Sequence, residues 1–195
     1  MKSKIALAVG GTLLLAAFIV FSFSVGTTQQ SSGKMEPTMV KRGEYLVTLG
    51  GCNDCHSPKV MTGMGPMPDS SRLLSGHPAN ENLPPLPSDA VGMGADKWAA
   101  VTNQHFTAWY GPWGVSFAIN LRPDKATGTG SWTEAAFIKA MRTGKHLGAG
   151  RVILPPMPWF NVGQLTDDDL KAIFAYLHSL KPIQNEVPMP IPPAK

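Results

Sequence analysis

A short run that holds the only two cysteines limits what this chain can become more than any other part of it. Cys52 and Cys55 are three positions apart, and His56 directly follows the second one. Two thiols at this spacing can form thioethers with two neighbouring vinyl groups on one porphyrin edge, and the histidine after them can donate a ring nitrogen to the iron. This C-x-x-C-H pattern is the attachment signature of a c-type haem. The sequence therefore predicts one covalent haem c, held by Cys52 and Cys55, with His56 as an iron ligand.

Three other kinds of site also use a closely spaced cysteine pair: a thioredoxin-like redox centre, half of a zinc site and a buried disulfide. The redox centre would require a βαβ pattern around the cysteines, and the surrounding sequence does not have one. The zinc site would require a second pair of ligands, which the sequence does not supply. The cysteines alone leave these alternatives open, but haem attachment also accounts for the adjacent histidine.

The composition predicts a loop-rich domain that a large apolar cofactor helps to hold together. Of 195 residues, 20 are glycine and 18 are proline, while only 15% are charged. The formal net charge is +4. Lys2 and Lys4 at the N-terminus carry two of these charges, and two haem propionates would neutralise the other two. Because no basic cluster is interleaved with aromatic residues, the sequence does not favour nucleic-acid binding.

The N-terminal segment predicts a membrane anchor or an export signal. Lys2 and Lys4 precede Ile5–Val25, which has no charged residue and as a helix would be about 31 Å long, enough to cross a bilayer. The lysines favour a cytoplasmic N-terminus and export of the remaining chain, a pattern that signal peptides share. Ser24-Val25-Gly26 is a poor cleavage site, which favours a retained anchor. The rest of the chain is then expected at the outer face of the cytoplasmic membrane, or in the periplasm after cleavage.

The first and last helices of the following domain can be recognised from their ends. Thr38 is a candidate N-cap for a helix that Gly50 and Gly51 would stop. Gly43 lies inside this helix, and such a glycine is typical of close approach by another element. The last helix would begin at Thr166 as N-cap, carry an apolar stripe at helical spacing, and end at Pro182.

The middle of the chain is predicted to be mostly loop. Residues 57–96 are rich in glycine and proline without lasting periodicity, so we expect them to wrap the haem edge. Apolar residues near one face predict a helix over Asp96–Trp109. A capping box from Ser131 to Glu134 predicts a further helix that ends at Gly144.

Two stretches resemble known haem domains. A helix with Gly-x-Tyr-Leu at residues 43–46, followed by C-x-x-C-H, resembles the start of a class I cytochrome c. The stretch I-N-L-R-P-D…T-G-T-G-S-W at residues 119–132 resembles the N-[IL]-T-P-D…T-G-[IL]-G-x-W pattern of cytochrome subunits of membrane-bound alcohol and sugar-acid dehydrogenases. Arg122 and Thr129 depart from that pattern, where those domains have threonine and an aliphatic residue. Those subunits carry several C-x-x-C-H motifs, so this chain resembles a stand-alone mono-haem relative.

The resemblance implies an all-α cytochrome c fold, in which the N- and C-terminal helices cross beside a loop-rich haem pocket. It implies that Gly43 faces an aromatic residue of the last helix, for which Tyr176 is the candidate. It also implies that a proline carbonyl about ten residues after the histidine accepts the Nδ1–H of His56, and Pro66 is the nearest match. The expected organisation is an anchor or signal at 1–26, a flexible tether at 27–36, the haem domain at 37–183 and a Pro-rich extended tail at 184–195.

The second axial ligand is expected to be Met157. It lies 101 residues after His56 and just before the last helix, as in the family, and prolines on both sides stiffen its loop. A thioether is a soft ligand that raises the haem potential when paired with histidine. The other methionines considered are too close to His56, within a helix, or in the tail; they are Met61, Met64, Met67, Met141 and Met189.

Four further residues are candidates for contact with the haem. Arg151 and Trp159 flank the Met157 loop and could hold the propionates. His77 and His105 are alternative iron ligands, although a lone histidine is more often a surface or capping residue.

With both axial positions filled, we expect outer-sphere electron transfer rather than catalysis. The sequence has no nucleophile–base pair, flavin or nicotinamide fingerprint, or second metal cluster. A quinol-oxidising complex, a terminal oxidase or a dehydrogenase would fit as redox partner. The alternatives are a haem oxidase or peroxidase and a gas-sensing haem protein, both of which require an open sixth position.

Overall fold

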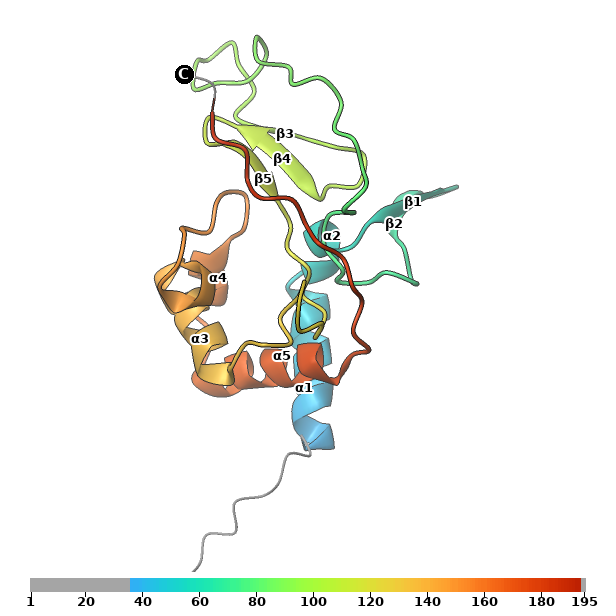
Figure 1. The fold of residues 1–195 in the computed structure, drawn as a ribbon, viewed down its shortest axis with the longest axis vertical. Helices are drawn as coiled ribbons and strands as arrows, with labels where there is room; N and C mark the ends of the chain where they lie inside the picture. The colour runs from blue at the N-terminus through green and yellow to red at the C-terminus, as the bar shows by residue number, and fades with distance from the viewer. Residues whose placement is uncertain (1–35, 194–195) are drawn as a thin grey trace, which may run out of the picture. The chain divides into compact units, whose positions relative to one another are not determined.

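The computed structural model describes residues 36–193. Five α-helices, one short 3-10 helix and five strands occur in these residues (Figure 1). In chain order the elements are α1 (Pro37–Leu49), α2 (Cys52–His56), β1 (Lys59–Thr62), β2 (Gly65–Pro68), β3 (Val101–Thr102), β4 (Ala108–Gly111), β5 (Gly114–Phe117), α3 (Glu134–Thr143), η1 (His146–Gly148), α4 (Trp159–Val162) and α5 (Asp167–Ser179).

The predicted N-terminal anchor or signal lies outside the described residues, as does the tether except for Glu36. Between residues 36 and 193, no helix combines the length and the apolar character that crossing a membrane requires.

Helices α1 and α5 pack against each other, as predicted, and α5 runs across α1 (Figure 1). Gly43 is buried where they meet. A Cβ atom at this position would collide with the backbone carbonyl of Ala172 and lie 2.7 Å from the Cβ of Tyr176. The side chain of Arg42, one residue earlier, donates a 2.9 Å hydrogen bond to Asp169. Glycine is therefore required at residue 43 because only a residue without a side chain lets the two backbones approach.

The core lies between α1, α3 and α5. Its buried side chains are apolar and recur at helical spacing on each helix. They include Leu46, Val47, Phe137, Ala140, Leu170, Ile173 and Leu177, and Leu74 from the long loop joins them.

The helix ends differ from the sequence predictions at two positions. Helix α1 begins with Pro37 in its first turn and Glu36 as N-cap, so Thr38 is inside the helix. Proline suits this place because its missing N–H would have no intrahelical partner. The N-cap of α3 is Thr133, whose hydroxyl accepts from the Ala136 N–H at 3.1 Å, so the predicted capping box at Ser131 is wrong. Gly144 ends α3 and Thr166 caps α5, as predicted.

The predicted helix over Asp96–Trp109 is wrong, and the fold is not all-α. Strands β3, β4 and β5 form an antiparallel sheet in that order, with Trp109 opposite Ser116. The side chain of Asn103 accepts hydrogen bonds from the N–H groups of Thr107 and Ala108, at 2.9 and 3.0 Å. Asparagine favours turns because its side chain forms hydrogen bonds with nearby backbone groups. The turn at Asn103 therefore forms in place of the helix that the apolar spacing of residues 96–109 predicts.

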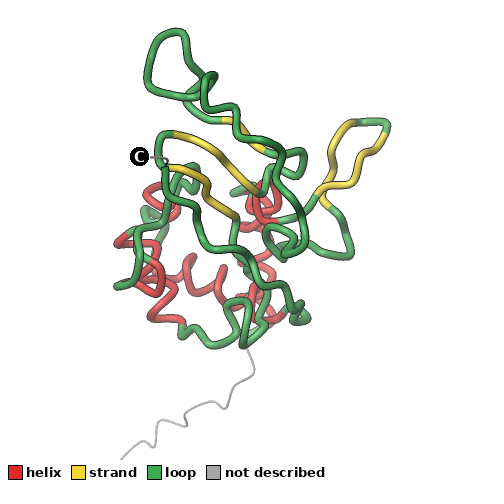
Figure 2. The backbone as a smooth tube through the Cα atoms, turned by 45° about the horizontal axis from the view of Figure 1, so that its top comes forward, coloured by secondary structure: helices red, strands yellow, loops and turns green. Residues whose placement is uncertain are grey.

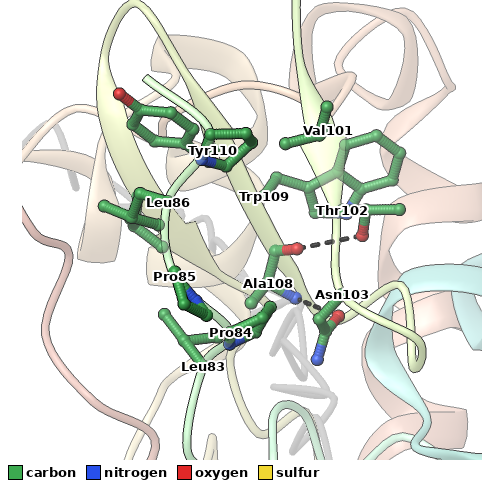
Figure 3. A pocket seen from close by; sticks show the side chains of 12 residues that line it. Leu83, Pro84, Pro85, Leu86, Val101, Thr102, Asn103, Ala108, Trp109 and Tyr110 are labelled. Carbon is green, nitrogen blue, oxygen red and sulfur yellow. Dashed lines mark hydrogen bonds between the residues drawn. The ribbon is translucent and has the colours of Figure 1, made fainter. Parts of the chain in front are cut away.

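The rest of the long middle segment is largely irregular, as predicted, with one hairpin formed by β1 and β2. Figure 2 shows most of the backbone between α2 and α3 as loop and strand. A proline-rich strap, residues 83–87, lies over β3 and β4 and leaves a small cavity of about 310 Å³ between them (Figure 3).

The C-terminal tail is extended and bound to the domain. The side-chain amide of Asn185 donates to the carbonyls of Ser75 and His77, at 2.7 and 2.8 Å. Further along, Ile191 and Val115 exchange two backbone hydrogen bonds. The tail therefore packs against the loop at residues 75–77 and against strand β5.

Candidate haem site

One cavity of about 730 Å³ brings the central residues of the sequence prediction together. Cys55, His56, Arg151 and Met157 all line it. The rest of the lining is mainly apolar and aromatic, and includes Trp109, Phe117, Ile119, Trp132, Ile153 and Leu154. An apolar lining with a few converging donor atoms suits a flat, largely apolar cofactor.

The cysteines lie on helix α2. Gly51 precedes this helix with a φ of 62°, a left-handed conformation that glycine adopts readily. The two cysteines are not joined in a disulfide. Burial raises the pKa of Cys52 to about 11, and burial also raises the pKa of Cys55. Raised pKa values differ from the lowered ones of redox-active cysteine pairs.

His56 is buried and held in one orientation. Its Nδ1 lies 2.8 Å from the carbonyl oxygen of Ile119. A carbonyl can only accept, so Nδ1 carries the proton and Nε2 keeps its lone pair, which is the form that binds a metal. Burial lowers the pKa of His56, which also favours the neutral ring.

The prediction that Pro66 accepts this proton is wrong. Pro66 belongs to the β1–β2 hairpin, and the acceptor is Ile119, 63 residues after the histidine. Counting along the chain cannot find such a partner, because the carbonyl group is common to all residues and only the folded chain selects one.

The segment after the histidine is also held by long-range hydrogen bonds. The hydroxyl of Ser57 donates to Asn53 at 2.7 Å and accepts from the N–H of Leu74 at 2.8 Å. The N–H of Gly76 donates to the His56 carbonyl at 2.7 Å. These bonds fix both ends of the turn that carries the imidazole.

Two methionines line the cavity. Met157 lies in the proline-rich loop before α4, and Met141 is a buried residue of α3. The sequence alone disfavours Met141 as an iron ligand, because it lies inside a helix. Because its side chain also lines the cavity, Met141 is the alternative to Met157 that an experiment must test.

The two alternative histidines do not line this cavity. His77 is fully buried, and its Nδ1 is 2.9 Å from the Thr107 hydroxyl. His105 accepts from the Lys59 N–H at 3.0 Å and faces Glu81 at 3.4 Å.

The two propionate candidates occupy different places. Arg151 lines the cavity, whereas Trp159 is not part of its lining and fills the space next to Gly144, where a Cβ would overlap the indole. The propionate roles of both residues stay predictions.

His146 is a cavity residue that was not among the predicted ones. It lines the cavity with its ring centre 4.9 Å from that of Trp132. Burial lowers its pKa, and the charge of Arg151 lowers it further. No local motif marks this histidine as part of the site.

The residues present fit a covalent haem. The Cys55 thiol, an imidazole with a free Nε2, a thioether and a cation line one mainly apolar cavity. Cys52 does not line this cavity and lies three residues before Cys55 on the same helix, at thioether spacing. This donor set matches iron held by histidine and methionine.

Comparison with known proteins gives the family. The Cytochrome c family model matches residues 40–181. The chain is 28% identical to the gluconate 2-dehydrogenase cytochrome c subunit of Pantoea cypripedii, over 98% of this chain and 33% of that protein. It is 27% identical to the cytochrome c subunit of alcohol dehydrogenase (quinone) from Gluconobacter oxydans, over 91% of this chain and 29% of that protein.

A third relative is a nicotinate dehydrogenase subunit of Pseudomonas putida, which is 29% identical over 83% of this chain and 10% of its own length. The chain thus spans about a third or less of these relatives. Together with the C-x-x-C-H helix and the cavity, the family match means that the chain belongs to the cytochrome c family and carries a covalently bound haem c for electron transfer.

Proposed function

We propose that this protein is a mono-haem electron carrier in which His56 and Met157 are the two axial ligands of the iron. The observation that carries the proposal is that one cavity is lined by both residues and by Cys55. The bond from His56 to Ile119 supports it further, because it leaves Nε2 free to bind a metal. When bound, the haem supplies a one-electron couple between ferric and ferrous iron.

Each group of the chain has a distinct part in this function. Cys52 and Cys55 keep the cofactor attached in both redox states. His56 is held in one tautomer by a part-buried backbone acceptor, and the sulfur of Met157, when bound to the iron, would favour the reduced form. The apolar lining keeps water from the iron, which also raises the potential. With both axial positions filled, a small molecule cannot bind the iron, so the proposal is electron transfer and not an enzyme reaction.

Carbon monoxide distinguishes this carrier from a haem enzyme or a gas sensor. Added to the reduced holoprotein, it is expected to leave the visible spectrum nearly unchanged, because Met157 occupies the sixth position. The oxidised protein should also show the near-infrared absorption of a methionine sulfur bound to ferric haem. Rapid and complete formation of a carbon monoxide adduct would contradict the proposal and favour an open-site protein.

The partners are proposed from the relatives. Those proteins are named as cytochrome or other subunits of dehydrogenases for gluconate, alcohol and nicotinate. We therefore expect a dehydrogenase as redox partner of this chain, with a quinol-oxidising complex or a terminal oxidase as the other partner.

The proposed location is the outer face of the cytoplasmic membrane, with Ile5–Val25 as a retained anchor. The ten residues 27–36 would then form a flexible tether that reaches about 16–19 Å. Such tethering would raise the effective concentration of the haem domain near membrane-bound partners.

The location can be tested by fractionation. The protein is expected in the membrane fraction after a high-salt wash and in solution only after detergent is added, since the anchor binds through apolar contacts. Mass spectrometry of the purified protein should find the N-terminal residues intact. A mature N-terminus near Thr27 would instead show a cleaved signal and a soluble periplasmic carrier.

A further inference from the structure

Lys59 is buried next to the haem-attachment helix, although it carries a charge. Its exposed fraction is 7%, whereas lysine is almost never this buried unless it is paired. It is the first residue of β1, shortly after the C-x-x-C-H segment. Nothing in the proposed electron-transfer mechanism uses this side chain.

The Lys59 ammonium has three hydrogen-bond acceptors, and all of them are backbone carbonyl oxygens of the attachment segment. They belong to Asn53, Asp54 and Ser57, at 3.0, 2.8 and 2.5 Å from Nζ. An ammonium group has three N–H donors, so each donor has one acceptor. A neutral amine, with two donors, would leave one of these carbonyls without a partner.

These carbonyls need a partner because of where they lie. Helix α2 has five residues, and the last carbonyls of any helix have no intrahelical donor. The carbonyls of Asn53 and Asp54 belong to the helix and lie toward the negative end of its dipole, at which a cation is favourable, whereas Ser57 is the extended residue just after the helix. The ring of Phe106 lies 6.0 Å from Nζ and covers the group on another side.

The charge is also close to the cofactor attachment point. Cys55 and Lys59 line one open cavity on this side of the attachment helix. Asp54, the nearest acidic residue in sequence, is exposed and its carboxylate is absent from the bonds to Nζ. The Lys59 ammonium is therefore hydrogen-bonded to carbonyl dipoles, and the Asp54 carboxylate attracts it without a hydrogen bond.

We propose that Lys59 is a positioning residue for the haem, which holds the segment carrying Cys52, Cys55 and His56 in place and raises the reduction potential through its buried charge. Ferric haem carries one more positive charge than ferrous haem, so a nearby cation disfavours the oxidised form. Removing the side chain would delete this cation and also expose the negative ends of three carbonyls. Both changes stabilise the ferric form, so the two effects add.

The backbone of Lys59 has a separate role that substitution leaves in place. Its N–H donates to Nδ1 of His105, and Nε2 of that ring faces Glu81. Substitutions of the Lys59 side chain leave this backbone hydrogen bond in place, so they test the ammonium group alone.

Redox titration of the holoprotein tests the proposal. Lys59→Met removes the charge and the donors at nearly constant volume, while Lys59→Gln removes the charge but keeps two donors. Both are expected to lower the ratio of reduced to oxidised protein, at a fixed solution potential, by about three- to tenfold, where tenfold is about 59 mV for one electron. Lys59→Arg keeps the charge and should stay closer to the wild-type potential than either.

The matched control is Lys171→Met on α5. Its side chain is 40% exposed and bonds Asp168 at the surface, so the variant makes the same change in net charge without affecting the attachment segment. Its potential should equal that of the wild type. The shift in the Lys59 variants should persist between about 0.1 and 1 M salt, because buried charges are screened far less than exposed ones.

A wild-type potential in Lys59→Met or Lys59→Gln would overturn the proposal and leave a purely structural role. Failure of both neutral variants to accumulate holoprotein, with recovery in Lys59→Arg, would support it. Failure of all three would also overturn it, since the shape of lysine and not its charge would then be essential. The proposal rests on haem attached at Cys52 and Cys55 and not on Met157, and the wild-type carbon monoxide spectrum reports separately on the sixth ligand.

Discussion

Replacing His56 with alanine is expected to abolish stable holoprotein. The change removes the proposed iron ligand and the last residue of the attachment signature, and it leaves the part-buried carbonyl of Ile119 without its 2.8 Å donor. An unsatisfied acceptor costs about 1–3 kcal/mol when fully buried, and less when part-buried. Loss of a residue that merely orients a metal ligand lowers metal affinity about 10- to 100-fold, so loss of the ligand itself should have a larger effect. Haem-stained gels and the visible spectrum measure the result.

The control for this variant is His178→Ala. His178 lies on α5, where its ring stacks on Phe174 at 3.9 Å, and it does not line the haem cavity. Its loss should leave the haem content unchanged. Normal haem content and an unchanged spectrum in His56→Ala would refute the assignment of the proximal ligand.

Met157→Ala is expected to leave the haem attached and to open the sixth position. The thioethers are not altered, so the denatured protein should still carry its haem. Loss of the sulfur ligand should lower the reduction potential, changing the equilibrium between reduced and oxidised protein by about tenfold or more, which is at least about 59 mV for one electron. The reduced variant should then bind carbon monoxide, which the wild type should not.

The matched variant is Met141→Leu, which removes the other sulfur that lines the cavity. Leucine has a similar volume, so this buried position should lose less than about 1.5 kcal/mol of stability. If Met157 is the ligand, Met141→Leu should keep both the wild-type potential and the resistance to carbon monoxide. The opposite pattern, with an unchanged Met157→Ala, would make Met141 the axial ligand.

The role of the attachment segment can be predicted because its chemistry is local. The spacing of Cys52, Cys55 and His56 is determined by covalent geometry along a few residues, whatever the rest of the chain does. Helix ends such as Gly144 and Thr166 are local for the same reason, since a left-handed glycine or a capping hydroxyl acts within one turn. Gly43 is also predictable, because an otherwise unfavourable glycine in a helix needs a packing explanation.

Other features depend on groups that carry no signature in the sequence. The bond from His56 to Ile119 and the three bonds from Lys59 all end on backbone carbonyls, which every residue has. The turn at Asn103 shows that local side-chain bonds can prevail over an apolar pattern that favours a helix.

The order of the amino acids predicts the haem, its covalent attachment and His56 as a ligand, and the resemblance to class I cytochromes c adds the crossing of the first and last helices. The folded chain was needed to find which carbonyl orients His56, that His146 and Met141 share the cavity with Met157, and that Lys59 is buried. The difference comes from the range of the interactions. Covalent spacing and capping act between neighbours in the chain, whereas burial and backbone hydrogen bonding across loops depend on segments that only folding brings together.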